Sequence, residues 1–147
     1  MNESYTMTLE EAPDALDVHF VRERLKAYNT AIVGDDEHRP LAAFVRDADG
    51  EIVGGLLGGT YWGWLHVDIL WVQDSLRGRG YGRALLAAAE QEAIRRGCRH
   101  AHLDTMSFQA LAFYQQQGYT VFGELHDLPA GHSRHFMKKT LQPESST

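Results

Sequence analysis

The stretch Val72-Gln73-Asp74-Ser75-Leu76-Arg77-Gly78-Arg79-Gly80-Tyr81-Gly82-Arg83 joins a predicted strand to a predicted helix and decides how this sequence folds. Its glycines carry no Cβ, so the backbone can turn sharply and approach a ligand closely. The helix that follows starts with N–H groups that have no partner inside the helix, at the positive end of the helix dipole. Such a loop is suited to phosphate. Positive side chains alternate with the glycines: Arg77, Arg79 and Arg83 beside Gly78, Gly80 and Gly82.

Known nucleotide-binding motifs do not account for this loop. A Walker-type loop ends in Gly-Lys-Ser/Thr, but Gly82 is followed by Arg83. A dinucleotide-binding fingerprint needs a further glycine at position 83 or 85, where Arg83 and Leu85 stand. A purely structural linker is the alternative, although three alternating glycines are more than a simple turn needs. We therefore expect a phosphate-binding loop outside these two classes.

The elements around the loop alternate between strand and helix. Residues 65–72 alternate strictly, so Leu65, Val67, Ile69 and Trp71 are expected on one face and His66, Asp68, Leu70 and Val72 on the other. A helix is predicted over about 80–96, followed by a strand over 99–104. Ser107 is expected to cap a short helix that ends before Gly118, and strands are predicted over 119–125 and 136–141. The pair Arg95-Arg96 is expected on the solvated surface.

The first half of the chain is rich in hairpin signals. We expect a strand over 5–9, an amphipathic helix over about 14–30, and strands over 41–46 and 51–57 joined by a turn at 47–50. Glycines in the second of these paired strands suggest bulges or close backbone approach. The predicted class is α/β (α+β), with a mixed sheet flanked by helices, in one domain spanning 1–147 with a loose tail over 142–147.

Composition limits the classes of function. The 147 residues are 44% hydrophobic and carry a net charge of −6, which argues against binding driven by charge to nucleic acid or to anionic membranes. No apolar run approaches the ~20 residues that cross a bilayer, and residues 1–11 lack the pattern of a signal peptide. Cys98 is the single cysteine and is expected to be a small buried residue. A cytoplasmic location is expected.

Two segments together resemble a known family. Arg77-x-x-Gly80-x-Gly82 opens a long helix after a strand, and Ala110-Leu111-Ala112-Phe113-Tyr114-Gln115-Gln116-Gln117-Gly118-Tyr119 follows downstream. This pair, in this order and at this distance, resembles the GNAT superfamily of acyl-CoA N-acyltransferases. The resemblance implies the GNAT fold, acetyl-CoA as co-substrate, and direct transfer of an acetyl group to an amine in a ternary complex.

The resemblance also implies roles for individual residues. The pyrophosphate would be held by backbone amides of the loop, and the pantetheine arm would pair with a preceding strand that is splayed from its neighbour. Tyr114 would protonate the leaving thiolate, while a strand amide near Leu70 would polarise the carbonyl group. Ser107 stands where the family usually has an Asn that contacts pantetheine. The expected cofactor contacts are Leu70, Val72, Arg77, Gly78, Arg79, Gly80, Tyr81, Gly82, Arg83 and Ser107.

The base that deprotonates the amine is less defined. Asp68 is the candidate on the alternating strand, because a buried carboxylate there would have a raised pKa. Asp104 is its rival at the end of the next strand, and an amine that arrives neutral would need no dedicated base. For the acceptor site we expect the aromatic group Tyr61, Trp62 and Trp64, together with Asp104 and His132. Each of these aromatic residues has core packing as its alternative.

Other functions remain in competition. A non-catalytic acyl-CoA-binding module would keep the loop but lack a working acid or acceptor pocket. A phosphate- or RNA-binding domain would use the three loop arginines, against the acidic total charge. No metal is expected: His100-x-His102 would place two side chains on one strand face, but there is only one cysteine and no His-Glu-x-x-His pattern occurs. The partner is expected to be a small-molecule or protein amine, with no nucleic acid and no membrane; a homodimer is compatible with the resemblance.

Overall fold

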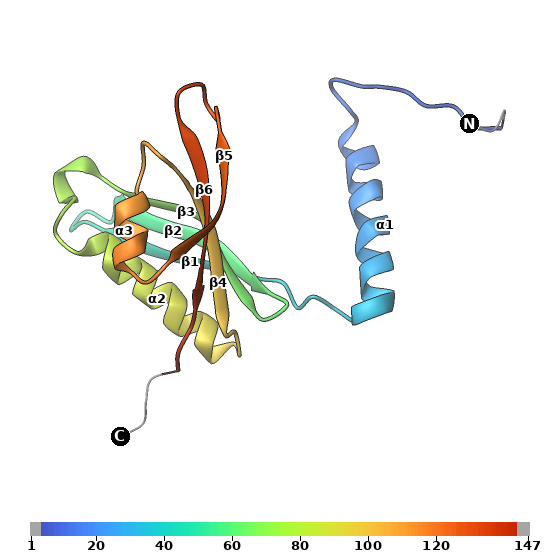
Figure 1. Ribbon diagram of the computed structural model, residues 1–147. Coiled ribbons are helices and arrows are strands. Elements are labelled where there is room, and N and C mark those ends of the chain that lie inside the picture. Colours follow the sequence, from blue (N-terminus) through green and yellow to red (C-terminus); the bar gives the residue numbers. More distant parts are fainter. Residues whose placement is uncertain (1–3, 144–147) are drawn as a thin grey trace. The chain divides into compact units, whose positions relative to one another are not determined.

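The computed structural model describes residues 4–143 and is shown in Figure 1. The chain falls into two units, one up to Asp36 and one from Glu37 onward. The expectation of one domain over 1–147 stays a prediction. No helix within residues 4–143 is both long and apolar enough to cross a bilayer.

The first unit contains the helix α1, Ala15–Val33. Asp14 caps it, as its Oδ1 accepts a hydrogen bond of 2.8 Å from the Leu16 amide. Gly34, at φ +83°, ends it and donates to the Thr30 carbonyl. The helix predicted over 14–30 is confirmed. The strand predicted over 5–9 is wrong: that segment has no strand partner, and Leu9 is 98% exposed, whereas a strand needs a hydrogen-bonded neighbour to be stable.

The second unit is a six-stranded mixed sheet in the order β1-β2-β3-β4-β6-β5. All contacts between neighbouring strands are antiparallel except β3 with β4. The helices α2 and α3 lie on one face of this sheet (Figure 1). The elements are β1 Arg39–Arg46, β2 Ile52–Tyr61, β3 Trp64–Val72, α2 Tyr81–Arg95, β4 His100–Met106, α3 Leu111–Gln116, β5 Thr120–His126 and β6 Ser133–Thr140. The predicted mixed α/β class is confirmed.

The core lies between the sheet and these two helices. Leu85 and Leu86 of α2 pack with Leu65 and Val67 of β3 in one cluster of buried side chains. Cys98 joins this cluster at 3% exposure, and burial raises the pKa of its thiol, so it is not a reactive thiolate. The prediction of a small buried cysteine is confirmed.

Arg96 fixes the C-terminal end of α2 to the sheet. Its guanidinium donates to the carbonyl oxygens of Arg39 and Pro40 and to Thr60 Oγ1, at 3.1–3.2 Å. Its Nε also donates to Glu92 at 2.8 Å, and this bond, followed by that from Arg95, lowers the pKa of the Glu92 carboxyl. The side chain is only 13% exposed. The expectation of a solvated Arg96 is therefore wrong, since the sheet edge offers three oxygens that its planar donors match.

A β-bulge in β3 changes which of its side chains face the core. Leu57 pairs with Ile69 but Gly58 pairs with Val67, so Asp68 is the extra residue. A Cβ at Gly58 would collide with the His66 carbonyl oxygen, so the backbones can approach only because this residue is glycine. Beyond the bulge, Leu70 and Val72 pack against the core.

The bulge corrects the strict alternation expected along residues 65–72. Leu65 and Val67 face the core before it, and Leu70 and Val72 face the core after it. The prediction that Leu70 and Val72 share a face with His66 is therefore wrong. Inserting one residue exchanges the two faces of a strand, because its side chains alternate with a period of two.

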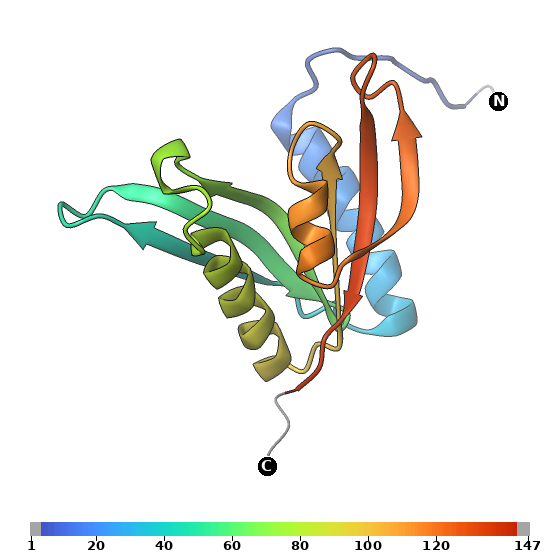
Figure 2. The same cartoon turned by 60° about the vertical axis from the view of Figure 1, so that its left-hand side comes forward.

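Two halves of the sheet separate at β3 and β4. These parallel strands pair only from Trp64 to His66 and from His100 to His102. Figure 2 shows β1–β3 diverging from β4–β6 beyond this short contact. The edge of β3 that faces β4 consequently has no strand partner from Val67 to Val72 within the described residues. The splayed strand that the resemblance implied is present.

The start of α3 differs from the prediction. Ser107 does not cap the helix; Thr105 Oγ1 accepts from the Ala110 amide at 3.3 Å instead. The Ser107 backbone N–H donates to the Ser133 carbonyl at 2.7 Å, and its Oγ accepts from the Ser133 amide at 3.0 Å. Ser107 therefore extends the contact between β4 and β6, a long-range pairing that local cap preference does not reveal.

Replacing Gly58 tests the bulge. We expect Gly58→Ala to destabilise the protein by about 2–3 kcal/mol, because the obstacle is a backbone oxygen that cannot rotate away. The measurement is urea unfolding followed by tryptophan fluorescence. Gly123→Ala is the control, since its Cβ would meet only Phe136 atoms at 3.9 Å. Equal stability of the two variants would contradict the close approach.

Candidate functional site

The loop before α2 presents backbone N–H groups to open space. Gly80 holds a left-handed conformation at φ +89°, where other residues are strained, and no atom lies within 4 Å of a Cβ built there. The first intrahelical bond runs from the Ala84 amide to the Gly80 carbonyl. The amides of residues 81–83 therefore precede the hydrogen-bond ladder, at the positive end of the helix dipole. This geometry suits an anion.

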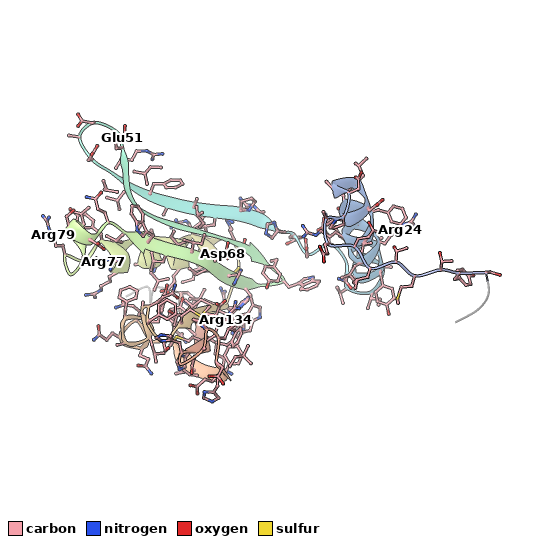
Figure 3. All side chains as sticks on the ribbon, turned by 90° about the horizontal axis from the view of Figure 1, so that it is seen from above. Arg24, Glu51, Asp68, Arg77, Arg79 and Arg134 are labelled. Carbon is pink, nitrogen blue, oxygen red and sulfur yellow. The ribbon has the colours of Figure 1, made fainter. Side chains whose placement is uncertain are left out.

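Arginines surround the loop. Arg77 Nε donates to the Val72 carbonyl at 3.3 Å, and its Nη2 lies 3.2 Å from Asp74 Oδ1. Both partners of this ion pair are mostly exposed, so it adds little stability. Figure 3 shows Arg77 and Arg79 together at the loop end of β3, with Asp68 farther along the strand. The loop end therefore carries exposed positive charge beside the free amides.

Tyr114 lies on α3, on the same face of the sheet as α2. It is 6% exposed and contacts the rings of Phe113 and Tyr119 edge-on, with centroids 5.2 and 5.9 Å away. Burial, followed by the negative charge of Asp104, raises the pKa of the Tyr114 phenol to about 12. The hydroxyl therefore keeps its proton at neutral pH and can donate it.

Aromatic and histidine side chains gather on the opposite face. Because Leu65, Val67, Ala101 and Leu103 face the core, the residues between them face away from α2. A pocket of about 510 Å³ opens there. Its lining residues are Tyr61, Trp62, Trp64, His102, Phe122 and Lys138. The three aromatic residues expected at the acceptor site thus lie together.

Asp104 and His132 are not among the residues that line this pocket. Asp104 Oδ2 accepts a 2.8 Å hydrogen bond from Arg134 Nε, which raises the pKa of the arginine. His132 Nδ1 lies 3.5 Å from Ser107 Oγ, and its ring contacts Phe108 edge-on. Both residues therefore have protein partners of their own.

Comparison with known proteins identifies the family. Residues 4–119 match the model of the Acetyltransferase (GNAT) family. The chain belongs to the GNAT acetyltransferase family. It is 40% identical over 131 residues to acetyltransferase Atu2258 of Agrobacterium fabrum, covering 89% of this chain and 96% of that protein. GNAT proteins are acyl-CoA N-acyltransferases, so this chain is an enzyme of that class.

Two further similarities agree with this assignment. Blasticidin-S acetyltransferase of Streptomyces morookaense is 42% identical over 109 residues, covering 71% of this chain and 80% of that protein. The crystal structure of an acetyltransferase from Agrobacterium tumefaciens superposes with a TM-score of 0.87 at 39% identity, covering 92% of this chain and 99% of that one. The GNAT fold inferred from the two sequence motifs is confirmed.

The aspartate expected as the base of this GNAT protein is not buried. Asp68 is the bulged residue of β3 and is exposed to solvent. The prediction of a buried carboxylate at this position is wrong, because Asp68 is the residue that the bulge leaves outside the regular pairing of β3 with β2. Asp104 is paired with Arg134, so neither aspartate is an unpaired carboxylate in the interior.

Two clusters were not expected from sequence. Glu90 of α2 accepts hydrogen bonds from Tyr119 Oη at 2.8 Å and from Lys139 Nζ at 2.9 Å, which ties α2 to the strands behind it. Burial and Glu90 raise the pKa of Tyr119.

The second cluster is a pair of histidines. His66 and His102 stack with ring centroids 4.6 Å apart. Their spacing gave no local signal, since parallel pairing brings together residues 36 apart in the chain. No group of three metal-ligating side chains occurs within residues 4–143.

The buried phenol of Tyr114 predicts a specific alkaline sensitivity. Its pKa is about 12 when folded and ~10 when unfolded, so its contribution is complete below pH ~10 and lost as the pH rises toward 12. We expect the wild type to lose about 2–3 kcal/mol more stability over this range than Tyr114→Phe. Urea unfolding of both proteins at several alkaline pH values measures the difference. Parallel loss in the two proteins would contradict the raised pKa.

Proposed function

We propose that the protein transfers an acetyl group from acetyl-CoA to an amine by direct attack in a ternary complex. The observation that carries this proposal is the arrangement around β3. A free helix N-terminus lies at one end of the strand, an unpaired strand edge runs from it, and a protonated tyrosine lies on the same face of the sheet. The helix N-terminus would bind the pyrophosphate, the strand edge would pair with the pantetheine arm, and the tyrosine would protonate the leaving thiolate.

The donor would bind on the face that carries α2 and α3. Backbone amides of residues 77–83 would hold the pyrophosphate, with charge from the loop arginines. The edge of β3 at Leu70 and Val72 would pair with the amide groups of pantetheine. Arg77 Nε already uses the Val72 carbonyl, so this pairing requires the arginine side chain to shift or the carbonyl to be shared. Ser107 is held by Ser133, and the proposed site does not need it.

The chemical step would take place where β3 and β4 separate. The Leu70 amide would polarise the thioester carbonyl, and Tyr114 would give its proton to the departing thiolate. The acceptor would approach from the other face, through the pocket of Tyr61, Trp62 and Trp64. We propose a basic small amine as the acceptor, since one relative carries the name blasticidin-S acetyltransferase and the net charge of −6 favours cations.

Calorimetric titration with acetyl-CoA tests the donor site. We expect saturable binding that Gly80→Asp weakens at least tenfold, because the new side chain strains a left-handed position and places a carboxylate beside the phosphates. Gly97→Asp is the matched control. Gly97 also has a positive φ, +90°, and no atom within 4 Å of a Cβ built there, but it follows the C-terminal end of α2, away from the loop. Absence of binding by the wild type, or equal loss in both variants, would contradict the proposed donor site.

Thiol release tests the transfer. A panel of blasticidin S, spermidine and a lysine-containing peptide, each with acetyl-CoA, should show amine-dependent release of CoA. With the amine that reacts fastest, Tyr114→Phe should lower turnover about a hundredfold or more and change acetyl-CoA affinity less than threefold. Tyr28→Phe, on an exposed position of α1, is the control. Equal turnover in Tyr114→Phe would remove the acid assignment, and binding without any release would favour a non-catalytic acyl-CoA-binding module.

A further inference from the structure

The turn between β2 and β3 holds a residue that its backbone conformation disfavours. Tyr61 pairs with Trp64, so Trp62 and Gly63 form a two-residue hairpin loop. Both have a positive φ, +47° and +78°, which is typical of a type I′ turn, where Asn-Gly is strongly preferred. Tryptophan carries a Cβ and a large ring, so the left-handed conformation at position 62 is strained.

Packing does not explain why a tryptophan stands in this turn. Trp62 is 51% exposed, and the only aromatic ring that it contacts within residues 4–143 is that of Tyr61, with centroids 5.9 Å apart. It does line the aromatic pocket of about 510 Å³. Backbone strain of this kind persists at sites where a side chain meets a ligand. The strain and the exposed indole together indicate that Trp62 serves a bound molecule rather than the fold.

The other walls of the pocket are held by the sheet. Tyr61 Oη lies 3.0 Å from His102 Nε2, and Trp64 stacks on His100 with ring centroids 4.6 Å apart. His102 lines the pocket and is also the last residue of β4 in register with β3. The pocket therefore adjoins the gap between these strands, where we place the chemical step.

Lys138 is the charged residue of the pocket lining, which contains no carboxylate within the described part of the chain. It lies opposite His102 in the register of β4 with β6, and its Nζ is 5.8 Å from the centroid of the Phe122 ring. No carboxylate of residues 4–143 forms an ion pair with Lys138, whereas the adjacent Lys139 is paired with Glu90. The pocket thus combines aromatic walls with one ammonium group.

This combination selects a particular kind of ligand. Burial, followed by the charge of His66, lowers the pKa of His102, so that ring adds no positive charge at neutral pH. Aromatic walls favour a flat ring that stacks on them or meets them edge-on. The ammonium group of Lys138 attracts a carboxylate, and it would repel the second ammonium group of a polyamine.

We propose that the acceptor is an amine on a flat aromatic body that also carries a carboxylate, with Trp62 against the ring and Lys138 paired with the carboxylate. This inference rests on the proposed acetyl transfer and names the class of its acceptor. The volume of the pocket, about 510 Å³, lies in the usual range for small-molecule sites. Trp62 and Lys138 are specificity-determining residues in this arrangement. They hold the body of the acceptor, while its amino group points toward the gap beside His102.

Two acceptors of equal shape test the role of Lys138. 4-(Aminomethyl)benzoate carries the carboxylate, and 4-(aminomethyl)benzamide replaces it with a neutral amide. We expect the wild type to prefer the benzoate by about fivefold in kcat/KM, the size of an exposed ion pair. Lys138→Gln should abolish this preference and leave the benzamide rate within about twofold. Lys26→Gln, on an exposed position of α1, is the matched control and should keep the preference.

A saturated ring tests the role of Trp62. Trp62→Asn should lower kcat/KM about tenfold with 4-(aminomethyl)benzoate, mainly through KM, because the aromatic contact is lost. With trans-4-(aminomethyl)cyclohexanecarboxylate, which has no flat ring, the loss should be clearly smaller. Trp62→Phe, which keeps an aromatic ring, should retain most of the activity. Each variant is compared with the wild type on the same acceptor, so the reactivity of the amine cancels.

Stability gives a readout that a structural role would move in the opposite direction. Trp62→Asn creates the Asn-Gly pair that a type I′ turn prefers. Its urea midpoint, followed by circular dichroism, should therefore equal or exceed that of the wild type. The affinity for acetyl-CoA should be unchanged, since the donor is proposed to bind on the other face of the sheet.

Several results would overturn the inference. A lower urea midpoint in Trp62→Asn, or equal losses with the aromatic and saturated acceptors, would make Trp62 a structural residue. A wild type without preference for the benzoate, or a preference that survives in Lys138→Gln, would remove the carboxylate. Release of CoA with spermidine but with none of the three ring acceptors would show that the acceptor class is wrong while acetyl transfer stands. If acetyl-CoA binds but no amine releases CoA, the transfer itself fails, and this inference fails with it.

Discussion

The close approach of Gly58 to the His66 carbonyl is the constraint on which the site depends. It permits one extra residue in β3, and that residue changes which side chains face the core. Leu70 and Val72 can then pack against the helices while their backbone edge stays free. A strand without this bulge would present Ile69 and Trp71 to the helices instead. The same glycine thus sets the packing of the core and the orientation of the strand edge that would meet a thioester.

The sheet separates two kinds of chemistry. On the helix side, the free amides at the start of α2 lie with exposed arginines, and a buried phenol keeps its proton. On the other side, an aromatic pocket is lined in part by His102, whose ring stacks on that of His66. The two sides meet where β3 and β4 stop pairing, after only three residues of contact. Parallel strands that diverge so early leave main-chain groups unsatisfied, which is stable only where water or a ligand replaces the missing strand.

Local sequence signals were enough to predict the loop, the long helix after it and the mixed sheet, because glycine spacing and helical periodicity are properties of adjacent residues. The bulge and close backbone approach that the glycines suggested are confirmed at Gly58. The glycines did not reveal that the extra residue is Asp68, since it stands on the partner strand, ten residues later. The expected strand over 5–9 failed for lack of a pairing partner, and the cap expected at Ser107 was displaced by its bond to Ser133. Asp104 and Arg134, like His66 and His102, meet only through the tertiary fold.

The anchoring of α2 is uneven along its length. Arg96 fastens its last turn to three oxygens at the edge of the sheet, and Glu90 holds its middle through Tyr119 and Lys139. Its first turn begins at Gly80 with no side-chain cap. Only the stretch before Leu85 lies outside these contacts and outside the core cluster. A shift of the loop would therefore change the first turn of α2 and leave the rest of the helix, and with it the strand gap, in place.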